Sequence, residues 1–159
     1  MEIVTYVFCC SEDRPEPEAV VEGSRLQGVC FDIVDSDANE DGCWSQLMLK
    51  ETESGRQIAV DCLAGEGSCV DAFSQEMESC GAMLDGLPES AGSRLVRDHL
   101  SATRFLVRTR FEIEDPNDEL FDFNSAILIY IHDNHDGMIF ARDEGFYDDQ
   151  DELIVSVAG

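Results

Sequence analysis

The 159-residue chain is strongly acidic, with 35 Asp and Glu side chains against 10 Lys and Arg and a formal net charge of −25. Such a charge repels nucleic-acid phosphates and anionic membranes, because both gain affinity when lysine and arginine neutralise them, so we expect neither direct nucleic-acid binding nor membrane association. The length and the 43% hydrophobic content favour a single α+β domain over residues 1–159 rather than a disordered acidic chain.

The first 64 residues are predicted to hold four strands. Residues 3–10 are apolar at successive positions, which is typical of a strand buried on both faces. Residues 26–34, 44–51 and 57–63 alternate between apolar and polar side chains, as strands with one covered face do. Residues 11–17 are polar and contain two prolines, which predicts a loop. Mostly short connections favour antiparallel pairing of these strands.

A helix is predicted next, and it ends near Gly86 and Pro88, which form a common stop signal. The chain then leaves open whether residues 89–101 form a short helix. The apolar stripe of the first helix recurs at helical spacing and consists of Val70, Phe73, Met77, Cys80 and Leu84.

The last third of the chain alternates between strands and a helix. Residues 104–113 alternate with period two and predict a strand with one solvated face. Residues 124–134 predict a second helix, capped by Asn124. Residues 138–141 and 153–157 predict two strands around an acidic loop. The whole pattern predicts an α+β fold with a mixed, mostly antiparallel sheet of about six to seven strands and two main helices packed on one face.

Seven cysteines are present without a C-x-x-C pair, and most lie in apolar segments, where free cysteine acts as a small hydrophobic residue. We expect reduced structural thiols and no cofactor. Neither a basic leader nor an apolar run of about 20 residues is visible, so a cytoplasmic location is expected.

The string from His132 to Asp136 is the best candidate for a metal site. His132 and His135 are three residues apart, which places them on one face of a helix, and Asp136 could complete the ligand set. The structural alternative is that both imidazoles interact with open carbonyls at a helix C-terminus.

An acidic hairpin connection near the C-terminus contains two aromatic side chains, a combination typical of partner contacts. The alternative is that these aromatic side chains fold back over the core and fix the loop. The predicted partner-binding residues are Glu144, Phe146, Tyr147, Asp148 and Asp149.

Three of the nine arginines, Arg104, Arg108 and Arg110, share one face of the predicted strand. They could form a small anion site, or they could bridge neighbouring carboxylates within the molecule.

Motifs for a nucleophile elbow, a phosphate-binding glycine loop or a zinc protease do not occur in the sequence. We therefore expect a non-catalytic binding protein, similar in kind to an inhibitor, an immunity protein or an adaptor, whose acidic surface meets a basic protein partner; a homodimer is also possible. Two alternatives stay open: a metal-binding protein or metal-dependent hydrolase centred on His132 and His135, and a structural domain whose acidity reflects a saline medium.

Overall fold

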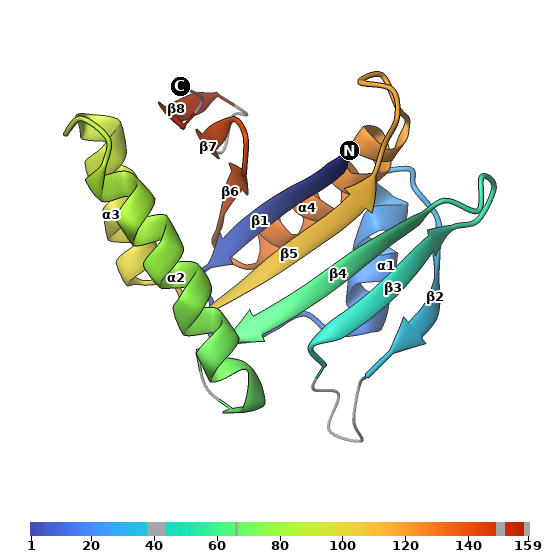
Figure 1. The fold of residues 1–159 in the computed structure, drawn as a ribbon. Helices are drawn as coiled ribbons and strands as arrows, with labels where there is room; N and C mark the ends of the chain where they lie inside the picture. Colours follow the sequence, from blue (N-terminus) through green and yellow to red (C-terminus); the bar gives the residue numbers. More distant parts are fainter. Residues whose placement is uncertain (38–43, 66, 149–151, 158–159) are drawn as a thin grey trace.

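A computed structural model describes residues 1–37, 44–65, 67–148 and 152–157 of the chain. The described residues form one eight-stranded sheet with helices on both of its faces (Figure 1). The elements in chain order are β1 (Glu2–Cys9), α1 (Pro17–Leu26), β2 (Phe31–Ser36), β3 (Gln46–Glu51), β4 (Gln57–Ala64), a 3-10 turn (Gly67–Cys69), α2 (Val70–Asp85), α3 (Ala91–Ser101), β5 (Phe105–Glu112), α4 (Leu120–Asn134), β6 (Gly137–Ala141), β7 (Gly145–Tyr147) and β8 (Leu153–Ser156).

The sheet order is β2-β3-β4-β5-β1-β6-β7-β8, and every neighbouring pair is antiparallel. The first strand of the chain therefore lies inside the sheet, which explains why its residues are apolar on both faces. β1 pairs with β5 over its whole length, whereas its register with β6 runs only from Thr5 opposite Ala141 to Cys9 opposite Gly137. Ile3 consequently lies beyond the end of β6.

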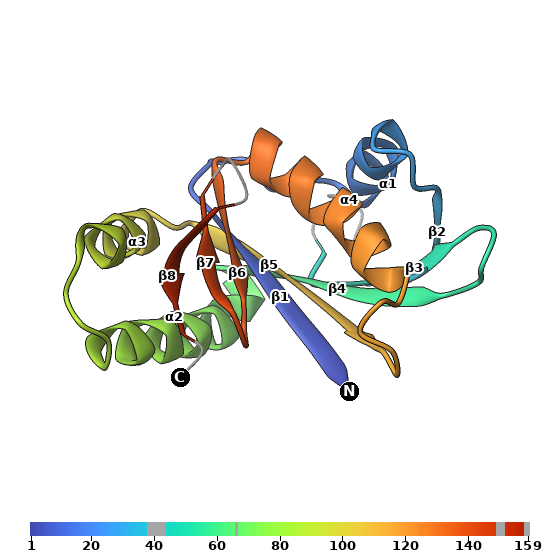
Figure 2. The ribbon, with the colours of Figure 1, turned by 90° about the horizontal axis from the view of Figure 1, so that it is seen from above.

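Side-chain alternation along β1 divides the interior into two cores. Val7 and Cys9 face α1 and α4 and pack with residues such as Ile127. Tyr6 and Phe8 face α2 and α3 and pack in the second core. Figure 2 shows the two helix pairs on opposite sides of the sheet. None of the helices in the described residues has the length and apolarity needed to cross a bilayer.

The α+β class and the largely antiparallel sheet are confirmed, but several predicted details are wrong. Over the part of the chain that the structure describes, the sheet has eight strands, because residues 145–147 of the predicted loop form β7. The described residues contain four α-helices rather than two, and these lie in pairs on opposite faces. The predicted packing of both main helices on one face fails because the apolar stripes of α2 and α4 meet opposite sides of β1.

The N-terminal ends of α1 and α3 explain why these two segments are helical. Pro17 occupies the first turn of α1, where a missing N–H costs no hydrogen bond, so proline starts a helix here instead of breaking one. Ser90 begins α3 with a capping box, in which its Oγ accepts from the Ser93 N–H at 3.0 Å and its own N–H donates to the Ser93 Oγ at 2.8 Å.

Candidate functional site

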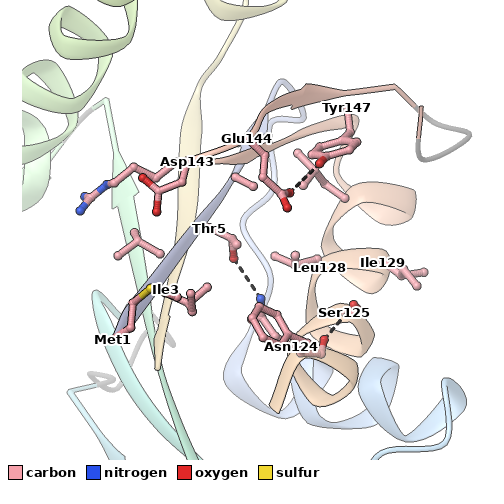
Figure 3. A pocket seen from close by; sticks show the side chains of 15 residues that line it. Met1, Ile3, Thr5, Asn124, Ser125, Leu128, Ile129, Asp143, Glu144 and Tyr147 are labelled. Atoms are coloured by element: carbon pink, nitrogen blue, oxygen red, sulfur yellow. Dashed lines mark hydrogen bonds between the residues drawn. The ribbon is translucent and has the colours of Figure 1, made fainter. Parts of the chain in front are cut away.

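A groove of about 490 Å³ lies on the α4 side of the sheet, where β1 extends beyond β6 (Figure 3). Its walls come from β1, at the start of the chain, and from α4, β6 and the β6–β7 hairpin, which follow one another more than 100 residues later. The lining residues are Met1, Ile3, Val4, Thr5, Phe121, Asn124, Ser125, Leu128, Ile129, Ile139, Ala141, Arg142, Asp143, Glu144 and Tyr147.

The walls of the groove are mostly apolar and follow from the regular spacing of its elements. Ser125, Leu128 and Ile129 lie three and four residues apart on α4, so they share one side of that helix. Ile139 of β6 lies directly opposite Tyr147 of β7, and opposed residues in a sheet present their side chains to the same face. Leu128 is buried, whereas the other four are half-buried or exposed, which leaves apolar surface open to a ligand.

The inner part of the groove carries a buried polar group, Asn124, whose side chain is 3% exposed. Its Nδ2 donates to the Thr5 Oγ1 at 3.1 Å, and the Thr5 and Thr109 hydroxyls share a short hydrogen bond. The Asn124 Oδ1 has no hydrogen-bond partner among the described residues. Leaving a buried acceptor unpaired costs about 1–3 kcal/mol, so this oxygen marks a place where a donor would be stabilised.

Acidic side chains stand at the mouth of the groove, on the hairpin between β6 and β7. Asp143 and Glu144 are both exposed. Glu144 Oε2 accepts a hydrogen bond of 2.6 Å from the Tyr147 hydroxyl, as Figure 3 shows. This bond, together with partial burial, raises the pKa of Tyr147 to about 12, because the carboxylate disfavours a neighbouring phenolate.

Gly145 sets the shape of this hairpin. Its φ of 147° lies outside the range that L side chains readily adopt, and a Cβ added there would lie 1.9 Å from the Val155 carbonyl oxygen. The close approach of β7 to β8 therefore depends on glycine at this position.

The predicted partner-binding segment is divided between the core and the surface. Phe146 is fully buried and stacks on Phe140 with 4.4 Å between ring centroids, so it belongs to the α2–α3 core and is not available as a surface anchor. Glu144 and Tyr147 reach the groove. Asp148 is half-buried, and its backbone N–H and its Oδ1 both bond to Glu152, whereas Asp149 lies outside the described residues.

The three predicted anion-binding arginines are engaged with carboxylates. Arg108 and Arg110 donate from their Nε atoms to Asp61 Oδ2 at 3.0 and 3.1 Å. Arg104 precedes β5 and lies 3.8 Å from Glu12 at the exposed surface. This arrangement is the intramolecular bridging that the sequence offered as the alternative to an anion site.

The structure does not bring the three predicted metal ligands together on one helix face. α4 ends at Asn134, and His135 has left the helical conformation with φ −131°. The His132 Nδ1 lies 2.9 Å from the Asp133 carboxylate, and the His135 Nδ1 lies 3.1 Å from the Ser11 hydroxyl. Asp136 is exposed in the left-handed region, with φ 51°.

Burial lowers the pKa of His135, and its contact with Asp13 opposes that shift. Its ring packs edge-on against Phe105 and Tyr130. Across the described part of the chain, no three His, Cys, Asp or Glu side chains gather in a way that could hold a metal ion.

A cysteine and a histidine that the sequence did not pair lie close together near the end of β1. Cys10 Sγ is 3.5 Å from His99 Nε2, but that nitrogen is also 2.7 Å from the Phe8 carbonyl oxygen. A carbonyl can only accept, so Nε2 carries the proton and cannot take one from the thiol. Burial raises the pKa of the Cys10 thiol, and the charge of Asp136 adds to the rise. The arrangement therefore lacks the base and the low thiol pKa that activate a nucleophilic cysteine.

Sequence reasoning identified Glu144 and Tyr147 but missed Ile3, Asn124 and Ile139 in the groove. The sequence position of Asn124 could have indicated a buried polar group, because this polar residue is in register with the apolar face of a helix. It was interpreted as the helix cap, but α4 begins four residues earlier and Asn124 lies within it. In comparisons with protein-family models, curated proteins and solved structures, nothing matches this chain.

Proposed function

We propose that this protein is a non-catalytic binding protein that acts through its negatively charged surface on a basic protein partner, in the manner of an inhibitor, an immunity protein or an adaptor. The proposal includes a cytoplasmic location, where Cys9, Cys10, Cys30, Cys69 and Cys80, which are free thiols in the structure, would stay reduced.

The observation that carries the proposal is the groove at the β6–β7 hairpin. It joins open apolar surface to exposed carboxylates, and the chain as a whole has a formal charge of −25. Protein interfaces combine an apolar centre with a polar rim, and complementary charge accelerates association and excludes partners of the same sign.

The chemistry of the remaining candidate sites agrees with a binding role. Arg108 and Arg110, which are partly exposed, both pair with the buried Asp61, so their charge is used within the molecule. Cys10 is held as a neutral thiol beside a His99 nitrogen that already donates to a carbonyl. Both arrangements are contacts within the molecule that stabilise its folded structure.

Affinity capture from a native lysate tests the proposal when it is run at low salt and at about 1 M salt, where the Debye length falls to about 3 Å. We expect a basic protein to be retained at low salt and largely released at high salt. Recovery of no partner under either condition would contradict the proposed function.

A further inference from the structure

We propose that the groove between β1, α4 and the β6–β7 hairpin binds a segment of the partner in which one large apolar side chain is flanked by lysine or arginine. This inference rests on the binding function proposed above and names the part of the partner that the groove recognises.

The size and walls of the groove fit a short segment that carries one large apolar side chain. Its volume of about 490 Å³ lies within the range of about 300–1,000 Å³ that is common for ligand pockets. The side chain of Leu128 is almost completely buried in the wall of the groove, whereas Ile129 and Ile139 leave part of their apolar surface exposed. An aromatic side chain would cover this surface at a low cost in conformational entropy, because it has few rotatable bonds.

The polar groups at the groove that lack a full set of hydrogen-bond partners among the described residues are acceptors. The Asn124 Oδ1 is buried without a partner among the described residues. Asp143 is exposed and makes no hydrogen bond within the described part of the chain, and Glu144 receives one hydrogen bond, from Tyr147, at one of its two oxygens. A ligand that pairs with the exposed Asp143 and Glu144 must bring N–H or O–H donors, and the carboxylates favour donors that carry positive charge.

The positive groups beside the groove are already engaged. Arg142 donates to the Tyr6 hydroxyl at 2.8 Å and lies over the Tyr6 ring, on the α2–α3 side of the sheet. The Met1 amine donates to the Ile113 carbonyl at 2.8 Å and lies 3.5 Å from the Glu112 carboxylate. Arg142 keeps its charge, but its guanidinium is directed toward Tyr6 on the other side of the sheet, and the Met1 amine is paired with Glu112. The exposed carboxylates of Asp143 and Glu144 at the mouth therefore complement a basic segment and disfavour an acidic one.

Three short peptides with blocked ends probe this chemistry: Lys-Trp-Lys, Glu-Trp-Glu and Lys-Ala-Lys. Each is titrated into the isotope-labelled protein while NMR follows the methyl groups of Leu128, Ile129 and Ile139. We expect Lys-Trp-Lys to shift these signals with a Kd of about 1 mM or lower, and the other two peptides to bind at least about fivefold more weakly.

A pair of matched substitutions shows whether the Lys-Trp-Lys peptide binds in the groove. Ser125→Trp places a large side chain over the groove from an exposed position on α4, where the serine hydroxyl bonds the carbonyl four residues earlier. Ser101→Trp makes the same change at an exposed serine of α3 with the same local bond, on the other side of the sheet. Lys-Trp-Lys binding should fall by at least about tenfold in the first variant and stay unchanged in the second.

A second pair of variants tests the charge without filling the groove. Asp143→Asn with Glu144→Gln removes two charges at the mouth, and Glu89→Gln with Asp98→Asn removes two exposed charges near α3. The first double variant should lose the preference for Lys-Trp-Lys over Glu-Trp-Glu, and the second should keep it. If Ser125→Trp fails to fold, this second pair of variants still shows whether the carboxylates at the groove select the basic peptide.

The outcomes separate the two proposals. The groove assignment is overturned by any one of three results. These are equal binding of Lys-Trp-Lys and Glu-Trp-Glu, methyl signals of Leu128, Ile129 and Ile139 that do not shift, or peptide binding that Ser125→Trp leaves unchanged. If the captured basic partner still binds the Ser125→Trp variant with unchanged affinity, the general binding function stands and the groove assignment falls.

Discussion

The Tyr147 hydroxyl donates to the Glu144 carboxylate at 2.6 Å across the β6–β7 hairpin, and both side chains line the groove. The bond fixes the phenol ring beside Ile139, with which Tyr147 is paired in the sheet. One aromatic residue of the hairpin therefore shapes the groove wall, while its neighbour Phe146 is buried on the opposite side of the sheet.

The Glu144 charge should control the ionisation of Tyr147. The bond to the carboxylate raises the pKa of Tyr147 to about 12, since the phenolate would meet a negative charge. Glu144→Gln keeps an acceptor but removes the charge, so the pKa should fall toward the ordinary tyrosine value of about 10. NMR titration of the Tyr147 ring carbon measures the change, and Glu89→Gln serves as the control. An unchanged pKa in Glu144→Gln would show that the bond does not form in solution.

Phe146 and Tyr147 should respond very differently to truncation although they are adjacent. Phe146→Ala removes a fully buried ring that stacks on Phe140, and we expect a loss of about 3–5 kcal/mol in the free energy of unfolding. Tyr147→Ala removes a half-buried ring and should cost less stability but weaken Lys-Trp-Lys binding. Urea unfolding and the peptide titration provide the two measurements. A stable Phe146→Ala variant with weakened peptide binding would reverse these roles.

Asp61 should be one of the most important charged residues for stability. Its side chain is 3% exposed and bonds both Arg108 and Arg110. Asp61→Asn leaves the partly buried Arg108 with Glu76 as its remaining ion-pair partner among the described residues, so we expect a loss of about 2–3 kcal/mol. Asp85→Asn removes the exposed partner of Arg97 and should change stability by less than about 1 kcal/mol. Equal effects of the two variants in urea unfolding would contradict this account.

Cys10 should react slowly with an alkylating reagent. Burial raises the pKa of its thiol, so a smaller fraction is thiolate at neutral pH, and the rate should rise as the pH increases toward that pKa. We expect Cys10 to be alkylated at least about fivefold more slowly than the exposed Cys30, as peptide mapping by mass spectrometry would show. His99→Gln should not slow the reaction further, because His99 Nε2 donates to Phe8 and does not act as a base. A fast, His99-dependent reaction would instead indicate a nucleophilic cysteine.

Most strands were predictable because their apolar residues repeat with period two, and α2 was predictable from its apolar stripe. The region from Pro17 to Phe31 was not, since two prolines and a following apolar run suggested a loop and a strand. Leu26, assigned to that strand, is instead the last residue of α1 and is largely exposed. Gly28, with φ 91°, then separates α1 from β2.

The groove could not be derived from local sequence patterns. Its residues meet because β1 pairs with β6 and extends beyond the end of that strand, and because α4 packs on the same face of the sheet. Neither relationship leaves a local pattern in the sequence. The hairpin segment was identifiable from its aromatic and acidic residues, but which aromatic side chain is buried depends on the register of β7 with β6, where Phe146 faces Phe140 and Tyr147 faces Ile139.

The most direct test of the account is carbodiimide cross-linking of the captured complex, since this reagent joins a carboxylate to a contacting lysine without a spacer. We expect Asp143 and Glu144 to form the main cross-links, to lysines that flank an aromatic residue of the partner. Cross-links confined to Asp85, Glu89 and Asp98, on the α2–α3 side of the molecule, would contradict the proposal that the partner docks at the groove.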